Sequence, residues 1–249
     1  MIAAAITDVG KVREINEDNY CIDENQVGLY MVADGMGGHK SGEVASSIAI
    51  NIIKEHITHY LTEEFQEQSV KGVIFEAFNR ANKEIYNRSK EDFDCEGMGT
   101  TVTMVLIIDK RVYIGHIGDS RAYLLREEVL QQITEDHSLV AELVRNGSIT
   151  EREAMRHPQK NIITRSLGTD ENLKVDIFSM DLNKGDILIL CTDGLTNFVD
   201  KEELKKAVLE EDDCFESCSN LVSLANQRGG YDNITVLIVK DQPTFTEGR

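Results

Sequence analysis

The sequence predicts an α+β fold in which meandering antiparallel sheets are flanked by helices. Short apolar runs rich in β-branched residues recur along the chain, bounded by Gly, Asp or Lys, which is typical of buried strands. Two long amphipathic patterns lie between the first and second of these runs. Three runs then follow in quick succession within residues 102–125. Strands and helices therefore come in blocks, which argues against the strict alternation of a doubly wound parallel sheet.

The elements can be placed in order along the chain. Two long helices are predicted around residues 44–53 and over 70–85, where apolar residues recur at i, i+3, i+4 and i+7, so each is expected to cover one sheet face. Capping boxes at Thr150-x-x-Glu153 and Asp200-x-x-Glu203 support two of the shorter helices. The shorter helices are predicted at 138–145, 151–156, 201–209 and 216–227, and the strands at 29–33, 102–108, 112–117, 122–125, 187–191 and 235–239.

Composition limits the function classes. The 249 residues include only 2 Pro and no low-complexity tract, so we predict one domain over residues 1–240 and a flexible tail at 241–249. The net charge of -18 argues against a nucleic-acid-binding surface. The five scattered cysteines indicate free thiols in a reducing compartment. The chain shows neither a signal peptide nor an apolar run of the ~18 residues that span a bilayer, so we expect a cytoplasmic protein without membrane association, and by default a monomer.

Apolar strands end in aspartate at three places. Asp34-Gly35 and Asp193-Gly194 each follow such a run directly, and Asp119 follows another after one glycine. A single Asp-Gly after a strand usually forms a hairpin turn, but that requires a second strand to follow at once. Helical patterns follow both Asp-Gly pairs instead. These aspartates are therefore candidates for a site at the rim of a sheet.

Further carboxylates stand in similar settings: Glu17 and Asp18 precede the first predicted strand, and Asp232 opens the last one. Taken singly, each is more typical of a solvated turn. Six carboxylates at one rim would repel one another severely unless cations neutralised them. Because all the side-chain donors are hard oxygens, the favoured ions are Mg²⁺ or Mn²⁺. A site with several such ions favours phosphate-ester hydrolysis, since it generates hydroxide from bridging water near neutral pH and clamps phosphoryl oxygens.

A phosphate also needs a fixed cation for its outer oxygens. Arg13, three residues before Asn16, offers a planar fork for bidentate contact, although its spacing alone fits a surface arginine equally well.

Eight short motifs appear in an order that resembles the metal-dependent type-2C protein Ser/Thr phosphatases, over about residues 6 to 239. The compact length is similar to that of the bacterial stand-alone members. The motifs are Arg13-x-x-Asn16-Glu17-Asp18, Val32-Ala33-Asp34-Gly35-Met36-Gly37-Gly38-His39, Gly99-Thr100-Thr101, Gly118-Asp119-Ser120-Arg121-Ala122-Tyr123, Asp136-His137-Ser138, Ile163-Thr164-Arg165-Ser166-Leu167-Gly168, Asp193-Gly194 and Gly230-x-Asp232-Asn233.

The resemblance implies a four-layer α-β-β-α sandwich with two central antiparallel sheets and the metals at one end. It implies that Asp34, Asp193 and Asp232 hold one Mn²⁺ or Mg²⁺. The second ion would be held by Asp34, as a bridge, and the Gly35 carbonyl, with Glu17 or Asp18 contributing directly or through water. Asp119 matches the position that, together with Asp193, binds a third and weaker ion in bacterial relatives.

The sequence departs from many eukaryotic relatives at the proposed general acid, a histidine after Asp-Gly. Met36 stands there and cannot donate a proton, so another group, such as a water on the third ion or His39, would have to protonate the leaving oxygen. An ordinary loop histidine is an equal interpretation of His39. Residues 145–168 resemble the family's mobile flap, which tunes substrate access.

The mechanism that follows is a single displacement. A metal-bridging hydroxide attacks phosphorus, Arg13 and the metals stabilise the developing charge, and no phosphoenzyme forms. The expected partners are phosphorylated proteins, in opposition to a Ser/Thr kinase and its substrates.

Other readings fit the sequence less well. No Cys-x5-Arg occurs, which excludes a cysteine-dependent phosphatase, and no Gly-x4-Gly-Lys-Ser/Thr occurs, which disfavours a P-loop hydrolase. The net charge of -18 disfavours a two-metal nuclease. A catalytically inactive adaptor of the same fold would not need to keep its clustered carboxylates.

Overall fold

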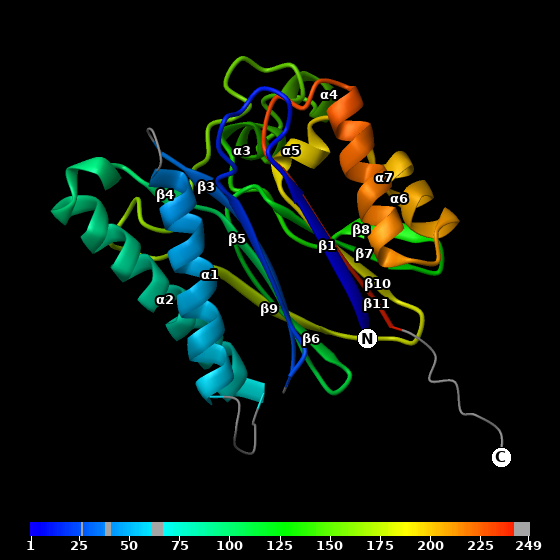
Figure 1. Cartoon of the computed structure of the whole chain (residues 1–249), viewed down its shortest axis with the longest axis horizontal. Coiled ribbons are helices and arrows are strands. Elements are labelled where there is room, and N and C mark those ends of the chain that lie inside the picture. The colour runs from blue at the N-terminus through cyan, green and yellow to red at the C-terminus, as the bar shows by residue number, and fades with distance from the viewer. Residues whose placement is uncertain (26, 38–40, 61–66, 242–249) are drawn as a thin grey trace.

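Two antiparallel sheets pack face to face, and helices cover the outer face of each (Figure 1). The computed structural model describes residues 1–25, 27–37, 41–60 and 67–241. In this part of the chain the layers run helix, sheet, sheet, helix, which confirms the predicted α+β class and the four-layer sandwich.

The first sheet has the strand order β1-β11-β10-β7-β8. Strand β11, the last strand of the chain in this sheet, lies between β1 and β10. Strand β1 pairs with β11 along the whole length of both strands. Helix α7 packs on β1 and β11, and α6 packs beside α7. The bounds are β1 (Ile2–Asp8), β7 (Arg121–Arg126), β8 (Val129–Gln132), β10 (Ile187–Cys191), β11 (Ile234–Lys240), α6 (Lys201–Glu210) and α7 (Cys214–Gln227).

The second sheet has the strand order β2-β3-β5-β6-β9, with the short β4 paired to β3. Helices α1 and α2 pack against each other and cover this sheet. The bounds are β2 (Asp18–Asp23), β3 (Gly28–Met36), β4 (Gly99–Thr100), β5 (Val102–Ile108), β6 (Arg111–Ile117), β9 (Asp176–Asp181), α1 (Ser41–Tyr60) and α2 (Glu67–Glu91).

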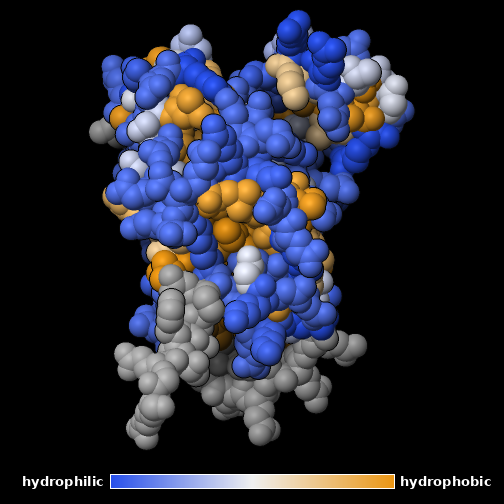
Figure 2. Space-filling view, turned by 90° about the vertical axis from the view of Figure 1, so that its right-hand side faces the viewer, coloured by the Kyte–Doolittle hydropathy of each residue, from blue (hydrophilic) through white to orange (hydrophobic). Residues whose placement is uncertain are grey.

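Three apolar layers hold the sandwich together. Tyr30, Leu190 and Leu237 belong to the central layer between the sheets, and all are fully buried. Phe78 belongs to the layer under α1 and α2, and Leu221 to the layer under α6 and α7. The outer face formed by α6 and α7 is mostly hydrophilic, with a small apolar patch near its middle (Figure 2). Burial of apolar surface on both sides of each sheet is the main stabilising contribution to this fold.

The remaining elements lie together at one end of the sandwich (Figure 1). They are the helices α3 (Leu139–Arg145), α4 (Glu151–Ala154) and α5 (Asp193–Thr196); a short 3₁₀ turn, η1 (Phe93–Cys95), follows α2. Ser138 and Thr150 cap α3 and α4, the latter in the predicted capping box, and Asp200 caps α6 in the same way.

All six predicted strands and all six predicted helices are present, several with longer bounds and α3 and α4 with shorter ones. The sequence patterns missed β1, β2, β4, β8, β9 and α5. The sequence of β1, Ile-Ala-Ala-Ala-Ile-Thr-Asp, is rich in alanine, which strands disfavour, and β2 and β9 begin and end in aspartate. The pairing of these strands with long neighbours outweighs their weak intrinsic preference.

Two sequence expectations touch the limits of the described residues. The predicted flexible tail at 241–249 lies outside them except for Asp241. Within the described segments, no helix combines the length and apolar character needed to cross a bilayer.

Replacing Leu237 with alanine should lower the free energy of unfolding by about 2–5 kcal/mol, because the side chain is fully buried between the sheets and leaves a cavity. Leu209→Ala is the matched control: this leucine on α6 is 46% exposed and should cost about 0.5 kcal/mol or less. Urea unfolding followed by circular dichroism measures both. Equal losses for the two variants would contradict the assignment of the central layer.

Candidate functional site

The sheet topology brings carboxylates from distant parts of the chain to the end where α3, α4 and α5 lie (Figure 1). Asp18 begins β2, and Asp34 lies near the end of β3, directly opposite Asp18 in the antiparallel register. Asp193 follows β10 as the first residue of α5, and Asp232 precedes β11. Because neighbouring antiparallel strands begin and end at the same edge, these four carboxylates share one edge of the sandwich.

Asp18 connects the two sheets. Its Oδ2 accepts hydrogen bonds from Thr192 Oγ1 at 2.8 Å and from Thr235 Oγ1 at 2.7 Å, both on the first sheet's side. Its Oδ1 is buried without a hydrogen-bond partner among the described residues. One oxygen of this carboxylate is therefore satisfied by the protein, and the other has no partner among the described residues.

The backbone of Asp34 is fixed by Thr101, the residue between β4 and β5. Its N–H donates to Thr101 Oγ1 at 3.0 Å, and its carbonyl accepts from the Thr101 N–H at 2.9 Å. Thr101 Oγ1 also lies 2.8 Å from Ser120 Oγ. Ser120 directly follows Asp119, so these bonds hold the Asp34 and Asp119 segments in one network.

The glycines that follow Asp34 and Asp193 are required by close packing. A Cβ on Gly35 would lie 2.1 Å from the Gly42 carbonyl oxygen, and one on Gly194 would lie 1.9 Å from the Asn233 carbonyl oxygen. Both approaches are far shorter than van der Waals contact. Only glycine lets the backbone come this close beside the acidic side chains.

Burial and mutual repulsion act on these acids together. Burial is the largest cause that raises the pKa of Asp34 well above its ordinary value, with Asp18 and Asp193 adding to the shift. Burial raises the pKa of Asp18 to about 7 despite the bonds from its two threonines. It also raises the pKa of Asp193, with Asp232 as the next cause. Each charge makes its neighbours harder to ionise.

Asp119 lies in the turn after β6 and is 8% exposed, with its Oδ1 buried and unpartnered among the described residues. Burial raises its pKa to about 8, and Asp193 and Asp136 add to the shift. Arg121 opposes this and holds Asp136 through two guanidinium nitrogens. Asp119 thus joins the same acidic group from the side of β6 and β7.

Arg13 and Lys160 face the acidic group from outside the sheets. Arg13, half-exposed, donates from Nη2 to Asp232 Oδ2 at 2.9 Å. Lys160, from the segment after α4, donates to Asn197 Oδ1 at 2.8 Å, and Asn197 Nδ2 donates to Asp193 Oδ2 at 3.0 Å. The sequence prediction placed Arg13 at the site, and the structure brings it there. The sequence prediction missed Lys160 and Asn197, because neither residue belongs to a motif whose chemistry indicates a role.

The remaining sequence candidates differ in their placement. The Glu17 carboxylate accepts a hydrogen bond from the Gly42 N–H near the start of α1, and burial raises its pKa. Its Oε1 has no partner among the described residues. Met36 ends β3, beside Asp34 and Gly35. His39 lies outside the described residues, so its proposed role as an acid stays a prediction.

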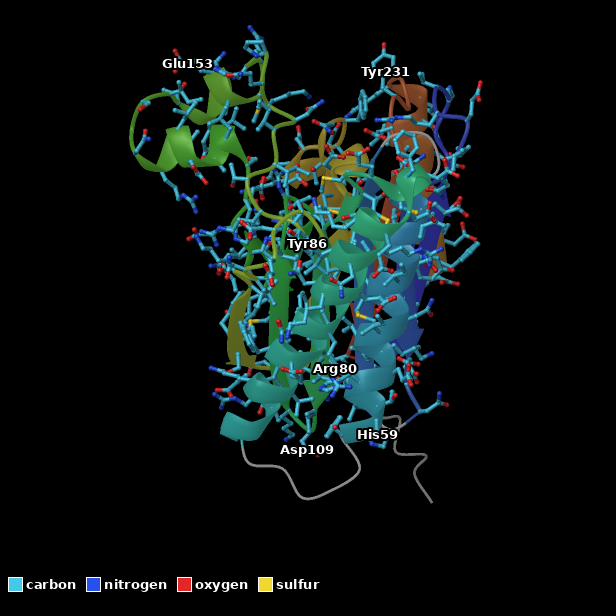
Figure 3. All side chains as sticks on the ribbon, turned by 90° about the vertical axis from the view of Figure 1, so that its left-hand side faces the viewer. His59, Arg80, Tyr86, Asp109, Glu153 and Tyr231 are labelled. Carbon is cyan, nitrogen blue, oxygen red and sulfur yellow. The ribbon has the colours of Figure 1, made fainter. Side chains whose placement is uncertain are left out.

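The end of the sandwich that carries these residues is hollowed between two prominences (Figure 2). Figure 3 shows Tyr231, next to Asp232, on one side of this end and Glu153 of α4 on the other. The two ends of the segment that carries α3 and α4 are held together, since the Thr164 N–H donates to the His137 carbonyl at 2.8 Å. Just after this segment, Leu167 pairs with Thr100 of β4.

The donor set fits a hard divalent cation. It is made of carboxylates with unpartnered oxygens at Asp18, Asp119 and Glu17, and Asp18 and Asp34 directly opposite each other would be destabilising without a counter-charge. Across the described ranges, no three Asp, Glu, His or Cys side chains meet closely enough to form a complete ligand cage. Carbonyl oxygens and water would supply the other ligands, as is usual for Mg²⁺.

The comparisons with known proteins agree with this geometry. A family model for Protein phosphatase 2C matches residues 11–238. The chain belongs to the protein phosphatase 2C family. It is 42% identical to the serine/threonine phosphatase stp of Listeria monocytogenes, over 94% of this chain and 93% of that protein. It is 37% identical to protein phosphatase PhpP of Streptococcus pneumoniae, over 96% of this chain and 97% of that one.

Solved structures of the protein phosphatase 2C family share the architecture. The Mycobacterium tuberculosis serine/threonine phosphatase PstP/Ppp superimposes with a TM-score of 0.88 at 36% identity, covering 97% of this chain and 99% of that one. The catalytic domain of PstP in complex with two manganese ions gives a TM-score of 0.82 at 35% identity, covering 95% and 96%. The family resemblance read from the eight motifs is therefore confirmed.

The acidic end of this protein phosphatase 2C chain should respond to pH and metal in a specific way. The pKa of Asp18 is about 7 in the folded chain, against an ordinary 3.8, so between these values the folded chain binds more protons than the unfolded one. The free energy of unfolding of the metal-free chain should therefore fall as pH rises through this window. We expect its Tm to decrease from about pH 5 to about pH 8, and Mn²⁺ to raise the Tm more at the higher pH.

Differential scanning fluorimetry with and without Mn²⁺ measures this effect. Asp119→Asn should flatten the metal-free pH dependence, because it removes a carboxyl whose pKa is raised to about 8. Asp109→Asn, at an exposed turn on the opposite end of the molecule (Figure 3), is the matched control and should leave it unchanged. A metal-free Tm that rises with pH would contradict this account of the acidic group.

Proposed function

We propose that this chain is a Mg²⁺- or Mn²⁺-dependent protein phosphatase that hydrolyses phosphoserine and phosphothreonine monoesters. The observation that carries the proposal is the gathering of Asp18, Asp34, Asp119 and Asp193 at one buried edge, with Arg13 facing them. The family supports it, since its relatives include proteins named serine/threonine phosphatases and a PstP structure with two manganese ions.

The positions of the carboxylates support the ligand set that the family resemblance implies. Asp34, Asp193 and Asp232 would hold one ion; Asp34 and the Gly35 carbonyl would hold a second, with Asp18 or Glu17 contributing directly or through water. Support comes from the unpartnered oxygens of Asp18 and Glu17, which are the kind of atom that a bound cation or its water would satisfy. Asp119, which has its own unpartnered oxygen and whose ionisation Asp193 opposes, would hold a third together with Asp193.

The proposed reaction is a single in-line displacement in which water replaces the serine or threonine oxygen on phosphorus. Bound Mg²⁺ or Mn²⁺ supplies a lowered pKa for coordinated water and neutralises phosphoryl charge. Arg13 binds the outer phosphoryl oxygens, because its guanidinium is half-exposed and keeps N–H groups free of the Asp232 contact for a bidentate interaction. The chain's cysteines are buried, and burial raises the pKa of Cys191 to about 12, so no thiolate nucleophile competes with water.

The substrates are phosphorylated proteins, so the enzyme reverses the action of Ser/Thr kinases. The net charge of -18 supports a protein substrate over a polyanionic nucleic acid. Five free cysteines support action in a reducing compartment such as the cytoplasm. Residues 1–240 act as one catalytic domain, since the site uses residues from Arg13 to Asp232.

Phosphate release from a phosphothreonine peptide should depend on Mn²⁺ and stop in EDTA. Asp193→Asn should lower kcat/KM by more than about 100-fold, because it removes a carboxylate from the ligand set. Asp109→Asn makes the same chemical change at the opposite end and should retain wild-type activity (Figure 3). A malachite-green assay measures all three, with a phosphotyrosine peptide as the specificity control. Mn²⁺ binding without any hydrolysis would favour a phosphoprotein-binding adaptor instead.

A second experiment tests for the absence of a phosphoenzyme. Enzyme mixed with a phosphate-labelled protein substrate and quenched in acid at short times should carry no covalent label, because water attacks phosphorus directly. Denaturing gels with autoradiography detect such a label. Label that remains on the chain and disappears on the timescale of turnover would overturn the single-displacement mechanism.

A further inference from the structure

The loop between β1 and β2, residues 9–17, carries Arg13 and lies beside the turn that leads into β11 (Figure 1). The two segments are more than 200 residues apart in sequence. The Lys11 N–H donates to the Gly230 carbonyl at 2.7 Å, and Arg13 reaches Asp232 by its side chain. The loop therefore rests on the turn at several points along its length.

The Asn233 side chain makes the most extensive of these contacts. Its Oδ1 accepts a hydrogen bond from the Glu17 N–H at 2.8 Å. Its Nδ2 donates to the carbonyl oxygens of Val9 and Ile15, each at 2.9 Å. The residue is 6% exposed. One carboxamide thus closes the loop on both sides of Arg13.

The chemistry of this position is specific to asparagine. The two carbonyl partners require a group with two N–H donors, and the Glu17 N–H requires an acceptor on the same planar group. Aspartate has the acceptor but no donor, and it would place negative charge against two carbonyl oxygens. Because the three partners are backbone atoms, they impose this requirement whatever the loop's side chains are.

The same turn holds Arg13 by a second route. Asp232, the residue before Asn233, accepts the 2.9 Å bond from the guanidinium, while Asn233 fixes the backbone on either side of Arg13. A long side chain on a loose loop loses conformational entropy when it binds a phosphoryl group, and a fixed loop avoids much of that loss.

We propose that Asn233 is a positioning residue that fixes the 9–17 loop so that Arg13 is held ready for the phosphoryl group of the substrate. Asn233 acts through Arg13 and does not itself touch substrate. The proposal rests on the function proposed above, in which Arg13 binds phosphoryl oxygens, and it adds the residue that determines where Arg13 stands.

A double-mutant cycle tests this coupling. Arg13→Ala should raise both the KM for a phosphothreonine peptide and the inhibition constant of inorganic phosphate by about tenfold or more, as expected for loss of a charged hydrogen bond. Asn233→Asp keeps the acceptor and loses both donors, and should raise the same two constants by about three- to tenfold while kcat changes less. In the Arg13→Ala background, Asn233→Asp should add less than about twofold, because the residue it positions is gone.

Two further variants control the cycle. Asn233→Ala repeats the double-mutant cycle without the added negative charge, and it replaces Asn233→Asp if that variant does not fold. Asn82→Ala is the matched control: Asn82 is equally buried and also bonds three backbone groups, Gly168 N–H and the carbonyls of Asp170 and Glu171. Asn82→Ala should change KM and the phosphate inhibition constant by the same factor in the wild-type and the Arg13→Ala backgrounds. An Asn233 effect that is also independent of Arg13 would overturn the proposal while leaving the phosphatase function intact.

Hydrogen–deuterium exchange of the full-length chain gives a readout that does not depend on catalysis. Amides within residues 9–17 should exchange faster in Asn233→Asp and Asn233→Ala than in wild type, and should be unchanged in Asn82→Ala. Unchanged exchange in this loop would overturn the proposal. A third outcome is faster exchange in this loop together with an Arg13→Ala variant whose KM and phosphate inhibition constant are unchanged. That outcome would contradict the role assigned to Arg13, and with it the proposed use of this loop in catalysis.

Discussion

The burial of several like charges at one edge of the sandwich is the constraint on which the site depends. Asp18 and Asp34 face each other across neighbouring strands, and Asp119 and Asp193 close the group from the side. Apolar packing between the sheets supplies the stability that offsets this repulsion in the metal-free chain. The repulsion between these carboxylates thus lowers the stability of an otherwise well-packed sandwich, and a bound cation would reverse this loss of stability.

The surrounding polar residues reduce that cost without removing it. Thr192 and Thr235 satisfy one oxygen of Asp18, and Arg121 neutralises Asp136 next to the Asp119 turn. Among the described residues, carboxylate oxygens of Asp18, Asp119 and Glu17 have no hydrogen-bond partner, and these are the atoms that a bound cation would satisfy. A fully satisfied hydrogen-bond network would have been more stable but would have left no atoms to bind a cation.

Much of this arrangement could be predicted from the sequence. The short apolar runs predicted the central strands, and the helical patterns predicted α1, α2, α6 and α7. Aspartates at strand ends indicated Asp34 and Asp193 as site candidates. The missed strand β2 shows the limit of such patterns. Its sequence has no alternation of apolar and polar residues, and it forms a strand because it pairs with β3. Lys160 and Asn197 were missed, and Asn233 was quoted in a motif without a role, for a related reason: each works through a contact with a residue far away in the chain. Nothing in the local pattern marks an asparagine as the partner of three backbone groups.

The strand order of the first sheet also determines when the protein can become active during its synthesis. Strand β11 lies between β1 and β10, so β1 has no neighbour in its sheet until residues 234–240 have left the ribosome. Asp232 and Asn233 arrive at the same moment, and only then does the 9–17 loop gain the turn on which it rests. Strand β1 and Arg13 therefore stay without these partners until the residues of β11 have been synthesised, and the site is completed only then.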